Sequence, residues 1–275
     1  GGCVLIKNIP QDLFKYNTSV ININSIFSGC IRLQSIPENL FMYNINVSTF
    51  NGTFYNCQSL TEIPENLFIY NTGVTSFNTT FSHCTSLIEI PSNLFDYNTN
   101  VTIFNNTFSN CYNLKTIPID LFRYNTGVTS FEQCFYYCQS LINIPNDLFK
   151  YNINVTNISF LFYFCVLLET VPDYLFRYNV LINNFNSVFY NCTKLQLNPW
   201  IFYANGEQST RFSGVTDISF QNCFYRISFT GIQGTAPDLW NCTFGTVTRT
   251  QCFGGSGNNT TSISNYNDIP SNWRT

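Results

Sequence analysis

Two glutamates, Glu62 and Glu89, are the clearest candidates for acid–base chemistry in this sequence. They stand 27 residues apart, which is the period of the internal repeat described below. If one repeat forms one coil, their carboxyl groups lie about 5 Å apart, the separation that retaining glycosidases use. The other repeats vary at this position, as a solvent-exposed face does: Asn8, Ser35, Thr116, Asn143, Thr170 and Leu197. The sequence therefore gives little support to a polysaccharide-active enzyme, and we expect no catalytic site.

Twelve cysteines offer a second kind of chemistry. Eight of them recur every 27 residues and define position 1 of the repeat: Cys3, Cys30, Cys57, Cys84, Cys111, Cys138, Cys165 and Cys192. Equivalent side chains on stacked coils run parallel, which is a poor geometry for a disulfide, so we expect buried free thiols here and at Cys134. Cys223 and Cys252 lie in irregular repeats where the backbone can shift, and we expect Cys223 to pair with Cys252 or Cys242.

Twelve Asn-x-Ser/Thr sequons make N-glycosylation a candidate modification. Position 17 carries a sequon in alternate repeats, at Asn46, Asn100 and Asn154, and Gly73 and Gly127 hold that position in between. A branched glycan is wider than one coil step of about 4.8 Å, so alternate sites leave room and we expect these three to be occupied. The remaining candidates are Asn17, Asn51, Asn78, Asn105, Asn157, Asn191, Asn241, Asn258 and Asn259. Chance in an Asn-rich chain is the alternative explanation.

Composition narrows the functional classes. Only 10% of the residues are charged and the net charge is −3, which offers no basic surface for nucleic acid. No apolar run reaches the length of a membrane-spanning helix. His83 is the only histidine and no Cys-x-x-Cys spacing occurs, so we expect no metal site, catalytic triad or cofactor. The chain opens Gly1-Gly2-Cys3, with Met42 as its one methionine, so we expect a processed chain of a secreted protein.

An internal repeat must position all of these residues. The unit C-x-x-L-x-x-I-P-x-N-L-F-x-Y-N-x-x-V-x-x-F-x-x-x-F-x-x recurs from Cys3 to Cys192 without a slip. A solenoid needs such a constant register, because each side chain stacks on its equivalent one coil away. We expect one solenoid domain over residues 1–275, with seven regular repeats in 1–191 and two expanded repeats and a truncated terminal repeat in 192–275. Residues 269–273 are aligned with 90–94 in this scheme.

Each part of the unit predicts a local structure. Positions 2–7 predict a short strand, which the proline at position 8 ends. Asn or Asp at position 10 predicts a turn or a helix cap, and one helical turn follows through Leu-Phe-x-Tyr. Asn at position 15 can close that turn in the left-handed region. Phenylalanines at positions 12 and 25 predict continuous internal columns.

The motif F-x-x-C-x-x-L-x-x-I-P, from Phe54 to Pro64 and in five further close copies, resembles the BspA-like leucine-rich repeats of bacterial and protist surface proteins. Residues 234–240 and 265–270 are similar to the ends of such proteins. The resemblance implies a leucine-rich-repeat solenoid with a parallel β-sheet on one face and short helical turns and loops on the other. It also implies a non-enzymatic cell-surface protein used in adhesion. The unit here is longer and richer in aromatic residues, so the resemblance implies no particular partner.

Two functional hypotheses follow. The first is an extracellular structural protomer that stacks head to tail into a fibre, because both ends of the chain fall on strand-like segments with open stacking surfaces. The alternative is a glycosylated surface adhesin that recognises a protein or carbohydrate partner. Its predicted strand face is small and polar, with no aromatic platform for sugar: Ser59, Thr61, Glu62, Ser86, Asn113, Lys115 and Ser140.

Overall fold

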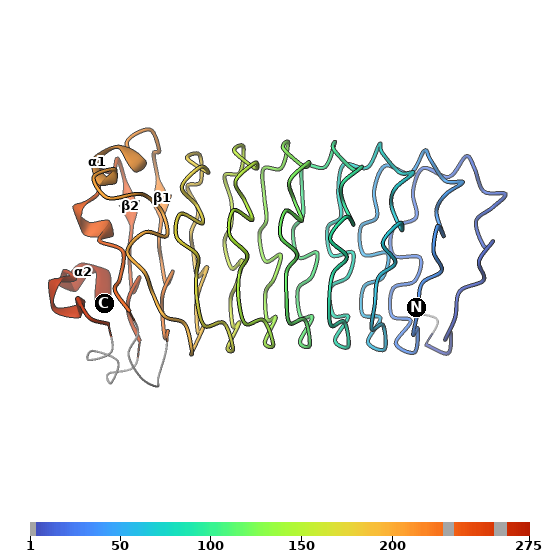
Figure 1. Ribbon diagram of the computed structural model, residues 1–275, viewed down its shortest axis with the longest axis horizontal. Helices are drawn as coiled ribbons and strands as arrows, with labels where there is room; N and C mark the ends of the chain where they lie inside the picture. The colour runs from blue at the N-terminus through green and yellow to red at the C-terminus, as the bar shows by residue number, and fades with distance from the viewer. Residues whose placement is uncertain (1–3, 228–233, 256–262) are drawn as a thin grey trace.

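The computed structural model describes residues 4–227, 234–255 and 263–275. The chain winds into an elongated solenoid whose coils follow one another along a single axis (Figure 1). Isolated parallel bridges join equivalent residues of adjacent coils at the 27-residue period from Asn22 to Asn184. Asn184 then pairs with Ser219, and Ser219 pairs with Thr248, so the last coils are longer. The predicted register of the repeat is confirmed.

The parallel pairing is centred on position 20 and not, as predicted, on positions 2–7. Bridges at position 20 are continuous: Asn22, Thr49, Ser76, Ile103, Ser130, Asn157 and Asn184. At position 6 they begin only at Asn143. The strands of the described residues are β1 (Ile218–Ser219) and β2 (Val247–Thr248), which pair in parallel. No continuous strand forms at positions 2–7, because a turn over positions 1–4 and the proline at position 8 leave few extended residues between them.

The Leu-Phe-x-Tyr segments form consecutive turns and not the predicted helical turn. In the second coil the amides of Leu40, Met42 and Asn44 each donate to the carbonyl three residues earlier, so only alternate amides are paired within the segment. Asn39, at position 10, has a left-handed φ of 56°, but Asn66 and Asn93 begin the same turns without one, so the alternate pairing does not depend on this φ. The described helices all lie near the C-terminal end: α1 (Gln208–Arg211), η1 (Leu239–Asn241), η2 (Tyr266–Asp268) and α2 (Ser271–Arg274).

Three columns of phenylalanine fill the interior. Rings within a column are nearly parallel; Phe81 and Phe108, at position 25, have centroids 5.7 Å apart and planes 5° apart. Rings of neighbouring columns are tilted; Phe95 and Phe104 have centroids 4.8 Å apart and an interplanar angle of 57°. Both arrangements avoid a face-to-face overlap of equal charge distributions. The predicted columns at positions 12 and 25 are therefore confirmed, and position 21 adds a third.

Position 15 forms a buried asparagine ladder, which consists of Asn44, Asn71, Asn98, Asn125, Asn152 and Asn179. Each side-chain amide donates to two backbone carbonyls of the preceding coil. Asn98 Nδ2, for example, lies 3.1 Å from the Phe68 oxygen and 2.9 Å from the Asn71 oxygen. Each of these carbonyls also accepts a turn hydrogen bond within its own coil, from the amides of Asn71 and Val74, so the side-chain amide supplies a second donor from the next coil. The position-15 asparagines therefore join successive coils, and are not the left-handed turn ends that we predicted.

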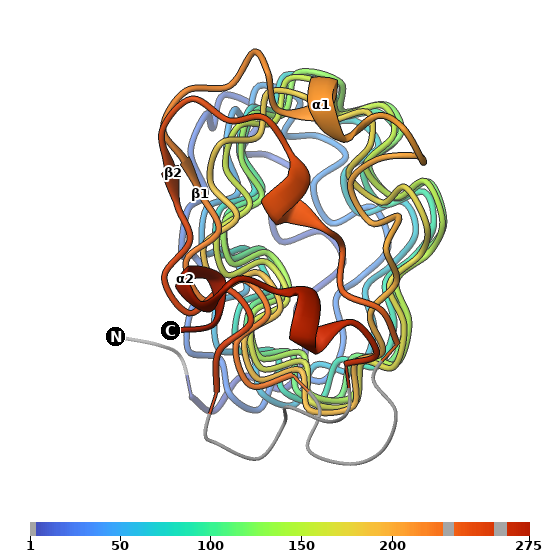
Figure 2. The same cartoon turned by 90° about the vertical axis from the view of Figure 1, so that its left-hand side faces the viewer.

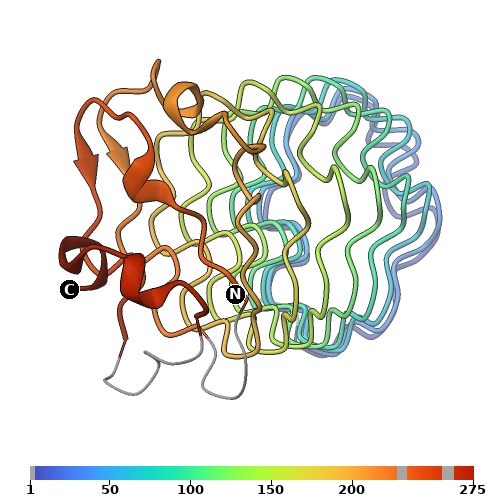
Figure 3. The same ribbon diagram turned by 60° about the vertical axis from the view of Figure 1, so that its left-hand side comes forward.

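The C-terminal segment covers the last coil. Residues 263–275 run across the end of the solenoid through η2 and α2 (Figures 2 and 3). The Gln251 and Phe253 amides donate to the Thr275 and Trp273 carbonyls at 3.1 and 2.9 Å. The alignment of 269–273 with 90–94 is therefore wrong, because this segment pairs where positions 22–24 of a further coil would pair. Trp273 is 2% exposed and packs near Phe220, which buries the end of the core.

None of the helices in the described ranges is long and apolar enough to cross a membrane.

The asparagine ladder can be tested with two substitutions in one coil. We expect Asn98→Ala to lower the free energy of unfolding by about 1–3 kcal/mol, because two hydrogen bonds between coils are lost while both carbonyls keep their turn donors. Asn100 is exposed and makes one hydrogen bond, to the Thr72 oxygen at 3.0 Å, so Asn100→Ala should cost less than about 1 kcal/mol. Urea unfolding measures both values. Equal losses would mean that the ladder does not join the coils.

Candidate functional site

An exposed tyrosine column runs along the outside of seven successive coils at position 14. Its members are Tyr16, Tyr43, Tyr70, Tyr97, Tyr124, Tyr151 and Tyr178. Their side chains are between 37% exposed, at Tyr151, and 88% exposed, at Tyr16. Position 12 and position 15 point into the core, which turns position 14 outward. Because the coils keep their register, the tyrosines recur once per coil step of about 4.8 Å and form a regular row along the outside of the solenoid.

Basic side chains at position 13 lie between these rings in the C-terminal half of the column. The Arg123 guanidinium carbon is 5.6 Å from the ring centre of Tyr124 and 5.4 Å from that of Tyr151. Lys150 Nζ lies 5.9 Å from the ring centres of both Tyr151 and Tyr178. Both cations also pair with an acidic residue three positions earlier.

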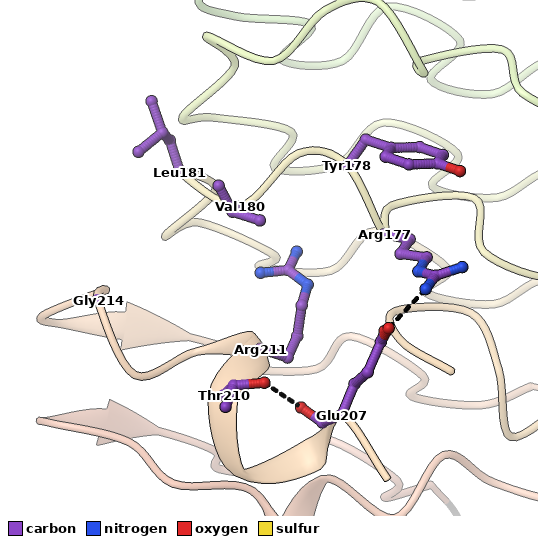
Figure 4. Close-up of a pocket in the computed structure, with 8 residues that line it drawn as sticks. All are labelled: Arg177, Tyr178, Val180, Leu181, Glu207, Thr210, Arg211 and Gly214. Carbon is purple, nitrogen blue, oxygen red and sulfur yellow. Dashed lines mark hydrogen bonds and ion pairs between the residues drawn. The ribbon is translucent and has the colours of Figure 1, made fainter. Parts of the chain in front are cut away.

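The tyrosine column ends at a pocket of about 530 Å³ between the seventh coil and the first expanded coil (Figure 4). Arg177, Tyr178, Val180 and Leu181 belong to the seventh coil. The other lining residues are Glu207, Thr210 and Arg211, in and just before α1, and Gly214. The column and the pocket therefore share Tyr178.

An ion pair between Arg177 and Glu207 lies on one side of the pocket (Figure 4). Arg177 Nη2 donates to Glu207 Oε1, and the other Glu207 oxygen accepts from the Ala204 amide at 2.9 Å. The hydrogen bond from the Ala204 amide, followed by that from Arg177, lowers the pKa of Glu207. Glu207 is therefore ionised at neutral pH.

Arg211 takes the place of the next ladder asparagine. Its Nη2 donates to the Phe176 and Asn179 oxygens at 3.0 and 3.1 Å, the carbonyls that a further position-15 asparagine would bind. Its Nε donates to the Phe202 oxygen at 3.0 Å, while its Nη1 has no hydrogen-bond partner. Burial lowers the pKa of Arg211 to about 10, so the guanidinium stays charged at neutral pH.

The position-17 sequons carry exposed asparagines, as Asn46, Asn100 and Asn154 are all on the surface. The other exposed candidates are Asn17 and Asn241, the half-buried ones are Asn51, Asn78, Asn105 and Asn157, and Asn191 is buried. Asn258 and Asn259 lie outside the described residues. Five of the ten sequon asparagines in the described residues are thus exposed.

The position-1 cysteines from Cys57 to Cys192 are buried free thiols, and each Sγ donates to a phenylalanine carbonyl of the preceding coil, as Cys84 does to Phe54 at 3.3 Å. Cys134 is also a buried free thiol, and Cys3 lies outside the described residues.

The predicted pairing of Cys223 with Cys252 or Cys242 is not formed in the structure, where the three thiols are free. Cys223 and Cys252 stack as parallel equivalents on adjacent coils, the same geometry that disfavours a bridge at position 1. Cys242 lies elsewhere, beside Tyr203 and Asp238. Peptide mapping of the native protein is the direct test of this pairing.

Glu62 and Glu89 are both exposed, on adjacent coils. The surface that sequence reasoning missed is the tyrosine column. The recurrence of Tyr-Asn at positions 14 and 15 of seven repeats indicates this column, but the sequence analysis predicts a binding surface only on the strand face. Arg211 had no signal, since it stands in an insertion without a repeat partner.

Several solved structures are similar to this one. A leucine-rich-repeat protein of T. pallidum is 22% identical, and the match covers 64% of this chain and 61% of that protein, with a TM-score of 0.28. The glycosylated Toll–Spatzle complex of Drosophila gives 19% identity, 78% and 34% coverage and a TM-score of 0.42. A leucine-rich-repeat protein of Bacteroides ovatus gives 17% identity, 89% and 69% coverage and a TM-score of 0.29. No protein-family model and no curated protein matches the chain.

The buried thiols can be tested by alkylation. Burial raises the pKa of Cys57 to about 12, so we expect native protein at pH 8.5 to leave Cys57 unmodified by iodoacetamide, while urea-denatured protein reacts. Because the pKa of the Cys57 thiol is higher in the folded state than in the unfolded state, ionisation of this thiol favours unfolding. Its contribution to stability is complete below about pH 8.5 and is lost as the pH rises through about 12. The urea midpoint should therefore fall over that window. Rapid labelling of native Cys57 at pH 8.5 would contradict its burial.

Proposed function

We propose that the protein is a non-enzymatic, extracellular binding module that recognises a partner protein through the tyrosine column. Tyrosine and arginine are the residue types most enriched at protein interfaces and among their energetically dominant contacts. The column presents seven tyrosines in a row, and the cations between them reduce the ordering cost of binding. The single observation that carries the proposal is this outward, regularly spaced aromatic surface on a rigid solenoid.

The dimensions of the column favour a macromolecular partner. Six coil steps of about 4.8 Å give a surface on the order of 30 Å long, comparable with one side of a protein interface. Exposed aliphatic side chains border it at position 16, where Ile45 is 59% and Ile153 is 54% exposed. A sugar needs open ring faces, whereas Arg123 and Lys150 lie over the rings of the C-terminal half. A protein partner therefore has more support than a carbohydrate partner.

Head-to-tail stacking into a fibre has less support. The first coil does leave part of its stacking surface open, since Leu13 is 43% exposed while its equivalent Leu40 is 2% exposed. The opposite surface, which stacking would need, is covered by Trp273 and α2. We therefore propose recognition of a partner protein in preference to self-assembly.

We also propose N-linked glycans at Asn46, Asn100 and Asn154. In each, the amide nitrogen would replace the pyrophosphate of a lipid-linked oligosaccharide and lose one proton. The hydroxyl residues of these sequons are exposed, as Thr102 is, whereas the sequon at Asn78 ends in Thr80, which is fully buried and donates to the Phe77 carbonyl.

Glycopeptide mass spectrometry of protein secreted from a eukaryotic host tests these sites. We expect high occupancy at Asn46, Asn100 and Asn154, and none at the buried Asn191, because a glycan there is incompatible with the folded coil. Gly73, which lies between two of the sites, has open space around it, so neighbouring glycans have room. Unmodified Asn46, Asn100 and Asn154 would refute the proposal.

Site-specific photo-crosslinking tests the recognition surface. One variant carries p-benzoylphenylalanine in place of Tyr97, and a matched control carries it in place of Thr75, which is exposed at position 19. Each is irradiated on intact cells of the source organism. We expect a discrete adduct from the Tyr97 site only, which excess wild-type protein suppresses at least tenfold more effectively than excess Tyr97→Ser/Tyr124→Ser protein. Equal adducts from both sites would exclude the tyrosine column as the binding surface.

A further inference from the structure

The pocket at the end of the tyrosine column carries one uncompensated positive charge. Its charged lining residues are Arg177, Glu207 and Arg211. Arg177 is paired with Glu207, which leaves Arg211 as the excess cation. Figure 4 shows Arg211 rising from α1 into the space between Val180 and Arg177. The pocket therefore favours a ligand with a single negative charge over a dianion, which Glu207 would repel more strongly.

Arg211 is 7% exposed, and the hydrogen bonds of its guanidinium leave Nη1 without an acceptor. A buried donor on a charged group is costly to leave unpaired. The backbone carbonyls that Arg211 does bind are fixed by the asparagine ladder, so the guanidinium cannot turn away without losing them. Nη1 itself is buried, so an oxygen anion in the pocket would balance the charge of the guanidinium without bonding to Nη1.

The opposite wall of the pocket is apolar and open. Val180 is 49% and Leu181 is 50% exposed, and Tyr178 adds a half-exposed ring. The side chains of Val180 and Leu181 stand on the far side of Arg211 from the ion pair, whereas Tyr178 lies above Arg177 (Figure 4). The Arg211 cation lies beside the aliphatic side chains of Val180 and Leu181. This arrangement matches a ligand in which a negatively charged group adjoins a short branched hydrocarbon. The volume of about 530 Å³ has room for such a ligand.

We propose that this pocket binds a carboxylate that bears a short branched apolar group. The carboxylate lies between Arg177 and Arg211, and the apolar group packs on Val180 and Leu181. Two sources have this chemistry, the C-terminus of a polypeptide that ends in leucine and a free branched-chain acid. Glu207 competes with the ligand, because its own carboxylate holds Arg177.

Calorimetric titration with three small probes tests the site and does not require the partner of the tyrosine column. The probes are acetyl-Gly-Leu with a free carboxylate, the same dipeptide as its C-terminal amide, and 4-methylpentanoate. We expect the free dipeptide to bind at least tenfold more tightly than the amide at neutral pH and low salt. If 4-methylpentanoate binds as tightly as the dipeptide, the source is a free acid. If it binds at least tenfold more weakly, the source is a chain terminus.

Two substitutions with opposite expected effects test the assignment. Glu207→Gln removes the competing charge and should tighten binding of the free dipeptide at least threefold. Arg177→Gln should weaken it at least tenfold, and Leu181→Ser should weaken it without changing the preference over the amide. Arg211 is left intact because it also joins two coils. If Arg177→Gln does not fold, Glu207→Gln and Leu181→Ser decide the question. Equal binding of acid and amide, or no gain in Glu207→Gln, overturns the proposal.

Discussion

The structure depends on one constraint: successive coils must be joined through the buried carbonyls that end their turns, and each of these oxygens takes a second donor from the next coil. Asn98 meets this need for the oxygens of Phe68 and Asn71, and the same two bonds recur along the ladder. Because a side-chain amide has a short reach, the donor must arrive at the same height in every coil. That requirement fixes the 27-residue period, and the period in turn lets the phenylalanine columns stack at nearly constant spacing.

The same register that builds the core also arranges the surface. Side chains at position 14 cannot enter the interior, because positions 12 and 15 already fill it, and they become a row of exposed rings. The residues at position 13 differ between coils, from Met42 and Ile69 to Arg123 and Lys150. A partner that lies along the column therefore meets apolar side chains in the second and third coils and cations in the last three. The core residue at position 12 and the surface residue at position 14 are only two residues apart in sequence. A substitution at one of these positions can leave the other unchanged.

Much of this fold could be predicted from the sequence, where a pattern repeats and the physics is local. The phenylalanine columns and the buried cysteines follow from the register, and exposure of Asn46 follows from its place after the buried Asn44. The prediction failed where the backbone conformation does not follow from the pattern of residue types. The segment after Asn39 pairs only its alternate amides in consecutive turns, where the apolar pattern predicts one helical turn. The C-terminal segment and Arg211 could not be predicted, because residues that occur once have no equivalent positions to compare.

Arg211 has a consequence for how such a chain can change in length. Because it binds the two carbonyls that a ladder asparagine would bind, the last regular coil offers the same acceptors as any coil before it. A duplicated or deleted 27-residue unit in the regular part would leave this junction intact. Gene duplication could therefore vary the number of exposed rings while the terminal structure is inherited unchanged. The length of the tyrosine column and the structure of the C-terminal pocket can therefore evolve independently.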